Sequence, residues 1–130
     1  MKNNIITFYV LLLILHLAHI IEEVIGNAPF IASLYGGVTN FLLINIGLLI
    51  LPLIILYLLY SQKRYALYFA LIYGVIMFLD GLDHLWEGTA GIYSGSVMII
   101  VATFVIVASW KEIRSKAAIL SNKQTSSHKP

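Results

Sequence analysis

The chain has 130 residues, of which 60% are hydrophobic and 11% are charged, and its mean hydropathy is +0.91. Ordinary soluble domains carry roughly a quarter charged residues, so this composition excludes a soluble globular protein. The formal net charge of +2 gives no reason to expect nucleic acid as a partner, and the lack of cysteine excludes disulfides, thiolate nucleophiles and cysteine-ligated zinc.

Four apolar stretches follow one another along the chain, at residues 5–26, 38–60, 65–86 and 92–110. Each is long enough to cross the hydrocarbon core of a bilayer as a helix. Helices are the expected form because lipid offers the backbone no hydrogen bonds. The short connections predict antiparallel sequential neighbours, so we expect an all-α integral membrane bundle of four transmembrane helices.

The connections and the tail are polar or contain glycine. The first connection covers residues 27–37, the second is a turn at residues 61–64, and the third covers residues 88–91. The expected transmembrane domain is therefore residues 1–114. The tail over residues 115–130 is rich in Ser, Lys and Asn, and we expect it to be disordered or to lie on the cytoplasmic surface.

The basic residues are confined to the N-terminus, the second connection and the region after the fourth stretch. They are Lys2, Lys63, Arg64, Lys111, Arg114, Lys116, Lys123 and Lys129. With four spans, these three regions share one side of the membrane. Because cytoplasmic loops carry an excess of Lys and Arg, we expect a multi-pass protein of the plasma membrane with both termini in the cytoplasm.

The acidic residues and histidines gather near the ends of the first and third stretches. These residues are His16, His19, Glu22, Glu23, Asp80, Asp83, His84 and Glu87. At about 1.5 Å per residue, both groups lie at similar depth in the outer half of the membrane, so they can meet. At about 100° per residue, each group forms one polar stripe, from which Glu22 points further round the helix.

The two stripes share a register. An offset of 64 residues pairs His16 with Asp80, His19 with Asp83, and Glu23 with Glu87. Two repeated helical hairpins of the same orientation would produce such a match.

No Lys or Arg lies within the four stretches, so these carboxylates have no cationic side chain at their own depth. Ionisable groups inside a membrane are costly, and they usually face one another or a water-filled cavity. Imidazoles and carboxylates in the core of a bundle suit Zn, Fe or Mn. We therefore expect a divalent metal ion whose ligands come from His16, His19, Glu23, Asp80, Asp83, His84 and Glu87.

Several functions use such a site. If the protein is an enzyme, Glu22 and Glu87 are the candidate catalytic carboxylates, and metal-activated water would act on a lipid-like substrate near the outer leaflet. A metal-free acid–base isomerase is a variant of this hypothesis. A proton or metal-ion transport subunit, acting as a homo-oligomer or with a membrane partner, is an alternative of a different class. A purely structural membrane protein is the third.

A five-residue segment at the end of the first stretch, His19-Ile20-Ile21-Glu22-Glu23, matches the signature of the HXXEE family of small multi-span membrane proteins. That family has no assigned function and is also defined by a further histidine and a Tyr-x-Pro-Gly motif. His84 corresponds to the histidine, and Tyr93-Ser94-Gly95 resembles the third motif without its proline. The resemblance covers most of residues 10–105. It implies a membrane fold and a role for His19, Glu22, Glu23 and His84, and it implies no reaction.

A second segment, at residues 83–88, is similar to the EXPERA group of four-span sterol isomerases and related binders. It reads Asp83-His84-Leu85-Trp86-Glu87-Gly88. In that group, acids inside the membrane move protons within a lipid-like substrate, which is an analogy for the metal-free variant.

Overall fold

The computed structural model describes residues 2–26, 28–87 and 92–126. These residues form five helices: α1 (Lys2–Gly26), α2 (Ala28–Tyr35), α3 (Val38–Tyr60), α4 (Ala66–Glu87) and α5 (Ile92–Ser126). All except the short α2 are long and apolar enough to cross a membrane. The predicted all-α architecture with four membrane-spanning helices is confirmed.

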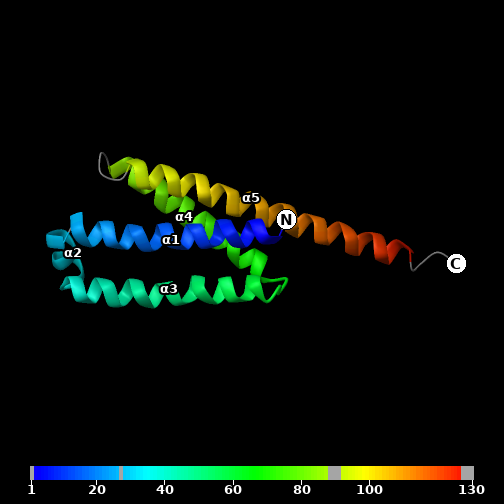
Figure 1. Ribbon diagram of the computed structural model, residues 1–130, viewed down its shortest axis with the longest axis horizontal. Coiled ribbons are helices and arrows are strands. Elements are labelled where there is room, and N and C mark those ends of the chain that lie inside the picture. Colours follow the sequence, from blue (N-terminus) through cyan, green and yellow to red (C-terminus); the bar gives the residue numbers. More distant parts are fainter. Residues whose placement is uncertain (1, 27, 88–91, 127–130) are drawn as a thin grey trace.

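The four long helices alternate in direction (Figure 1). Helices α1 and α3 lie side by side, α4 crosses behind α1, and α5 returns along α4. The start of α1, the turn between α3 and α4, and the C-terminal part of α5 therefore lie toward one end, and α2 lies at the other. The basic residues of the turn are thus separated from the acidic residues near the end of α1, as the charge pattern predicts. Which end faces the cytoplasm stays a prediction.

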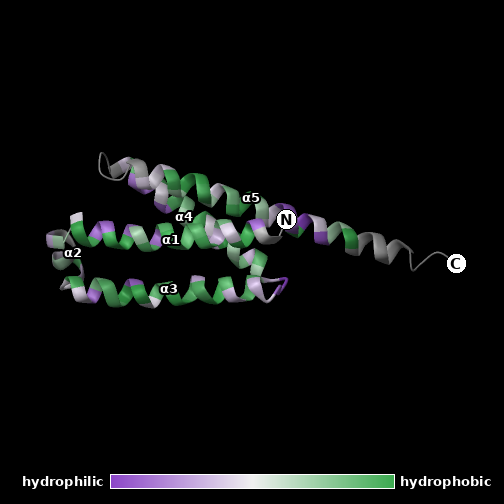
Figure 2. Ribbon diagram, in the orientation of Figure 1, coloured by the Kyte–Doolittle hydropathy of each residue, from purple (hydrophilic) through white to green (hydrophobic). Residues whose placement is uncertain are grey.

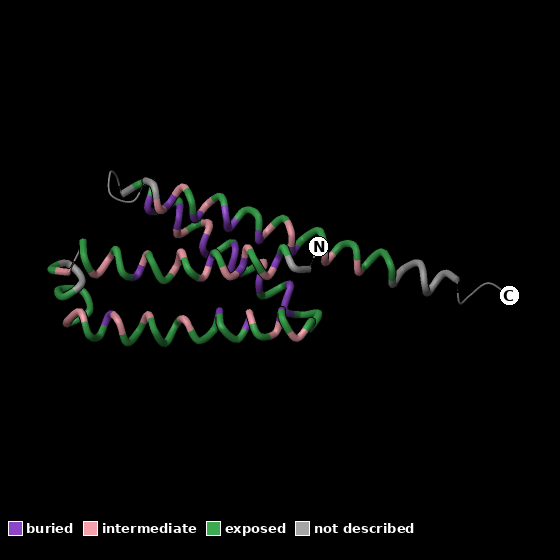
Figure 3. Tube along the Cα trace, viewed as in Figure 1, coloured by how far each residue is buried: buried purple, intermediate pink, exposed green. Residues whose placement is uncertain are grey.

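Apolar residues dominate the long helices along most of their length (Figure 2). Much of this apolar surface faces outward: many residues along the long helices are exposed (Figure 3). On α3, for example, Leu43, Leu48 and Leu51 are each at least 60% exposed. Large exposed apolar patches are rare on soluble monomers, and lipid is the solvent that suits them.

The main core lies where α1 meets α4 and α5, in the half of the bundle toward the α3–α4 turn. Tyr9 and Leu12 of α1 and Val105 of α5 are completely buried there. The Tyr9 hydroxyl donates a hydrogen bond of 3.2 Å to the backbone oxygen of Pro52. This bond ties α1 to α3 in a region otherwise filled by apolar side chains.

Removing the Tyr9 hydroxyl tests how much this hydrogen bond stabilises the protein. We expect Tyr9→Phe to lower the free energy of unfolding by about 0.5–1 kcal/mol, the usual range for one hydrogen bond between helices. Tyr57→Phe is the matched control, because Tyr57 is 68% exposed on α3. Unfolding in mixed micelles with increasing dodecyl sulfate measures both variants, and an equal loss in the two would contradict the expectation.

Helices α4 and α5 pack most closely because small residues line their contact. On α5, Gly95, Ala102 and Ser109 recur every seven residues, and all three are buried. They face a seam on α4 that includes Gly74 and Gly81. A Cβ added to Gly95 would lie 2.8 Å from the backbone oxygen of Gly81, so the two backbones touch at this point. Small residues commonly allow such an approach between helices in membranes.

The first connection contains a helix that the sequence analysis did not predict. Residues 27–37 were expected to form a connection, and α2 occupies most of it. Pro29 is the second residue of α2, where its fixed φ angle and missing N–H are tolerated. Gly36 follows the last residue with a φ of 71°, a left-handed conformation that ends a helix readily.

The tail is helical over most of its length. Helix α5 continues through residues 115–126, so disorder is not found there, and a position on the cytoplasmic surface stays a prediction. Ala117 and Ala118 are strong helix formers. Lys116 also pairs with Glu112 one turn earlier, at 3.6 Å, which supports the helix as it leaves the apolar region. Residues 127–130 lie outside the described part of the chain.

The two helical hairpins pack differently. Helices α4 and α5 are in close contact along the glycine seam, whereas α1 and α3 are connected through α2 and touch less extensively. A hairpin repeat would relate His19 to Asp83, yet His19 is half-buried and Asp83 is exposed. The repeat stays a prediction from the sequence register.

Candidate metal centre

His19 of α1 meets Asp80 and His84 of α4 in the half of the bundle nearer α2. One ligand atom from each residue lies within 4.8 Å of the other two. The sequence favours this arrangement locally, because residues four apart on α4 lie on one face of the helix. Helix α1 runs in the same direction as α4 and brings His19 to the same depth.

The two histidines touch directly. Their Nε2 atoms are 3.0 Å apart, and their rings meet edge to face with centroids 4.0 Å apart. In a tetrahedral site, two nitrogens bound to one zinc ion at about 2.0–2.1 Å are about 3.3 Å from each other. The observed pair therefore needs only a small outward movement to hold an ion, and the Asp80 carboxylate offers a third donor.

Packing against α5 fixes one of the ligands. His84 is 8% exposed, whereas His19 and Asp80 are half-buried. A Cβ added to Gly95 would lie 3.0 Å from the Cβ of His84, so α5 packs directly against the base of this side chain. The His84 imidazole is held on the rigid side of the site, and His19 and Asp80 border the open side.

A polar cavity of about 250 Å³ opens beside these ligands. Residues of α1, α2, α3 and α4 surround it, namely His19, Ile20, Glu23, Tyr35, Phe41, Asn45, Asp80, Asp83 and His84. Liquid water occupies about 30 Å³ per molecule, so the cavity has room for several waters or a small polar group. No Lys or Arg is among these lining residues, and three carboxylates are.

A second cavity of about 250 Å³ lies between α1 and α5. It is mostly apolar and is lined by Leu15, Ala18, His19, Glu22, Ser94, Val97 and Met98. His19 lines both cavities. The polar chamber and the apolar gap therefore meet at one of the candidate ligands.

Below the three ligands, hydrogen bonds extend toward the middle of the bundle. His16 lies one turn before His19 on α1, and its Nδ1 atom is 2.7 Å from the hydroxyl of Tyr73 on α4. The ring of Tyr73 packs against that of Tyr9, with centroids 5.3 Å apart. The polar residues thus continue inward from the ligands and end at the bond between Tyr9 and the Pro52 backbone oxygen.

The structure brings three of the seven predicted ligands together, namely His19, Asp80 and His84. Glu23 and Asp83 line the adjoining polar cavity outside this group. His16 is hydrogen-bonded to a tyrosine.

The two predicted catalytic carboxylates lie elsewhere. Glu22 is exposed and lines the apolar cavity, and the side chain of Glu87 lies outside the described residues. Their catalytic roles stay predictions.

Two neighbours of the site were not among the predicted residues. Tyr73 precedes Asp80 by seven residues, which is about two helical turns, so it shares a helix face with Asp80. This spacing could have identified Tyr73 from the sequence. Asn45 of α3 donates its amide to the Phe41 backbone oxygen at 2.9 Å while it lines the polar cavity. No periodic pattern on α3 indicated that Asn45 would face the site, because α3 is apolar around most of its circumference.

Comparisons of the chain with protein family models, with curated proteins and with solved structures give no match. Function is therefore inferred from the geometry of the site.

Proposed function

We propose that this protein binds one divalent metal ion inside the membrane, with His19, Asp80 and His84 as ligands. The observation that carries the proposal is the approach of these three donors to within 4.8 Å of one another. Two imidazoles and one carboxylate are a ligand set that suits zinc, iron or manganese. Three protein ligands beside a cavity are typical of sites that keep one position open for water or substrate.

Charge around the polar cavity supports the same conclusion. Glu23, Asp80 and Asp83 line it, and no Lys or Arg side chain is among the lining residues. Carboxylates at this depth are costly unless a proton or a cation offsets their charge. A divalent ion at the ligands would offset Asp80 directly and would attract the other two.

The proposal extends to an amphipathic substrate. Because His19 lines both cavities, a molecule with its apolar chain between α1 and α5 would bring its polar group to the metal ligands. A bound ion would supply Lewis acidity to that group. Glu22, on the wall of the apolar cavity, is the candidate to accept a proton there. Membership of the HXXEE family is part of this proposal and rests on the motif at residues 19–23.

The apolar core favours a one-sided site over a transport path. Within the described residues, the hydrogen bonds that run inward end at Tyr9 and Pro52. Beyond them, the half of the bundle toward the α3–α4 turn is filled by apolar side chains such as Ile5, Leu59 and Leu67. A proton or an ion crossing a single chain would have to pass this predominantly apolar region.

Metal analysis of the detergent-purified protein tests the proposal. After equilibration with zinc, iron(II) or manganese and removal of the free ion, we expect about one ion per wild-type chain. Asp80→Asn keeps the shape of the side chain and removes its charge, so we expect it to lower the occupancy at least about tenfold. Wild-type protein without a stoichiometric ion would refute the proposal.

Asp83→Asn is the matched control for this experiment. It makes the same chemical change one turn further along α4, on a residue that lines the cavity and stands outside the three-ligand group. We expect it to retain the ion. An equal loss of metal in both variants would show that general acidity of the cavity, and not the three-residue group, binds the cation.

A further inference from the structure

At the end of the bundle opposite the metal ligands, two cationic side chains border a cavity between α4 and α5. Arg64 and Lys116 line this cavity, whose volume is about 150 Å³. The rest of its wall is formed by Leu67, Tyr68, Ile113 and Ala117. The cavity therefore combines positive charge with a predominantly apolar wall.

Backbone oxygens and N–H groups hold Arg64 and its turn at this place. The Arg64 guanidinium donates a hydrogen bond of 3.4 Å to the Lys116 backbone oxygen, which links the turn to α5. At the end of α3, the N–H of Lys63 bonds to the Leu58 oxygen, and the N–H of Gln62 bonds to the Leu59 oxygen. These two bonds and the left-handed φ of 59° at Gln62 form a tight helix end that fixes the turn.

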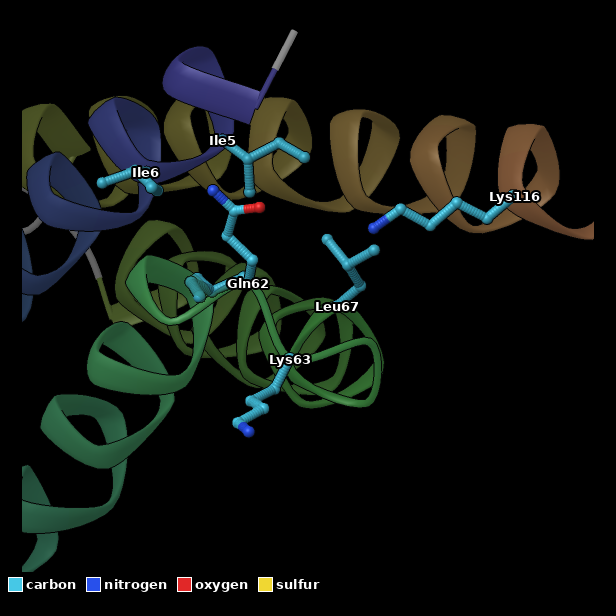
Figure 4. A pocket seen from close by; sticks show the side chains of 7 residues that line it. Ile5, Ile6, Gln62, Lys63, Leu67 and Lys116 are labelled. Atoms are coloured by element: carbon cyan, nitrogen blue, oxygen red, sulfur yellow. The ribbon is translucent and has the colours of Figure 1, made fainter.

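A smaller adjoining cavity brings a third cation close. It is lined by Ile5, Ile6, Leu59, Gln62, Lys63, Leu67 and Lys116, so it shares two residues with the first cavity. In Figure 4, the Lys116 ammonium group is directed toward Leu67, which both cavities share. Glu112 is an anion near these groups, paired with Lys116 at 3.6 Å. With Lys63 and Arg64 included, the local charge stays positive.

The position of the turn sets the level of these charges in the membrane. One candidate span ends at Tyr60 and the next begins at Ala66, so Arg64 lies between two helix ends at the bilayer surface. The bond from Arg64 holds Lys116 beside this turn, close to the end of the candidate span Ser94–Ile119. Both cations therefore lie at the ends of spans, near headgroup depth, where anionic lipids attract Lys and Arg.

We propose that this cavity binds an anionic phospholipid, with its phosphate between Arg64 and Lys116 and an acyl chain against the apolar wall. A guanidinium and an ammonium group both donate strong hydrogen bonds to phosphate oxygens. The apolar wall explains why a lipid, and not a free anion, is the ligand. The site is independent of the metal ligands.

Lipid retention measured by native mass spectrometry tests this proposal on the full chain released from detergent. With phosphatidylglycerol and phosphatidylcholine supplied in equal amounts, we expect wild-type protein to retain the anionic lipid about tenfold more. The Arg64→Gln/Lys116→Gln variant should lose this preference. Arg64→Gln alone, which changes one exposed residue in the turn, should lose part of it and guards against misfolding of the double variant.

Lys111→Gln/Arg114→Gln is the matched control. It removes the same charge from exposed positions of α5 that line neither cavity, so it should keep the preference. Equal losses in the two double variants would overturn the proposal in favour of general surface charge. Displacement of the retained lipid by millimolar inorganic phosphate would overturn it in favour of a simple anion site.

Discussion

Replacing His84 by alanine is expected to weaken zinc binding at least about 100-fold, because loss of a ligand exceeds the 10–100-fold effect of losing a partner behind one. His84 faces His19 at 3.0 Å and is the most buried of the three donors. A competition titration with a chromophoric chelator measures the affinity. His19→Ala should cause a loss of the same order from the opposite helix, so one misfolded variant cannot account for both results.

His16→Ala is the control for the histidine experiment. His16 is one turn deeper on α1 and is hydrogen-bonded to Tyr73, outside the three-ligand group. We expect its zinc affinity to stay within a few-fold of wild type. If His16→Ala and His84→Ala weaken binding equally, the ligand assignment is wrong and the ion lies deeper between α1 and α4.

Replacing Gly95 by valine is expected to lower the free energy of unfolding by about 1–3 kcal/mol, the usual cost of forcing extra atoms into a packed contact. A Cβ there would lie 2.8 Å from the Gly81 backbone oxygen and 3.0 Å from the Cβ of His84. Backbone atoms cannot move aside as a flexible side chain can, so α5 must shift away from α4. Because His84 packs on this contact, we also expect zinc affinity to fall.

Gly47→Val is the control for the packing experiment. Gly47 lies inside α3, and a Cβ added there meets no atom within 4 Å. The substitution carries the same change in helix propensity without the steric conflict, so stability and zinc affinity should stay close to wild type. Unfolding in mixed micelles measures the stability, and the chelator titration measures the zinc affinity. Equal destabilisation by both valines would show that propensity, and not the α4–α5 contact, is responsible.

The four long helices could be predicted from the sequence because lipid leaves the backbone few choices. A run of about 20 apolar residues forms a helix in a bilayer almost regardless of its neighbours. Helix α2 and the extension of α5 escaped prediction for the opposite reason. Local helix signals are present in both segments: Pro29 in residues 28–35, and the alanines at 117 and 118 in residues 115–126. The polar or glycine-bearing residues around these signals favoured a connection and a non-helical tail instead.

The candidate site was predicted as a group of residues, but not as a set of contacts. Counting residues from each helix start placed His19 and His84 at one depth, and the structure brings them together. Depth does not fix how each helix is rotated, and the shared register relates His19 to Asp83 by a predicted repeat without saying which residues touch. The rotation of α4 depends on its glycine contact with α5. That contact is made by glycines, which are not part of the polar stripe although Gly81 directly follows Asp80, so the stripe alone could not predict it.

The direct contact between His19 and His84 has a consequence for the tautomers of the two rings. At 3.0 Å between Nε2 atoms, one nitrogen must carry a hydrogen and the other must offer its lone pair. A divalent ion held by both Nε2 atoms needs both lone pairs, so the shared hydrogen and the ion exclude each other. A neutral imidazole can carry that hydrogen on Nδ1 instead, so ion binding requires one of the two histidines to change tautomer. Filling the site would then be visible as a change in the nitrogen NMR signals of that ring, even where the ion itself has no colour.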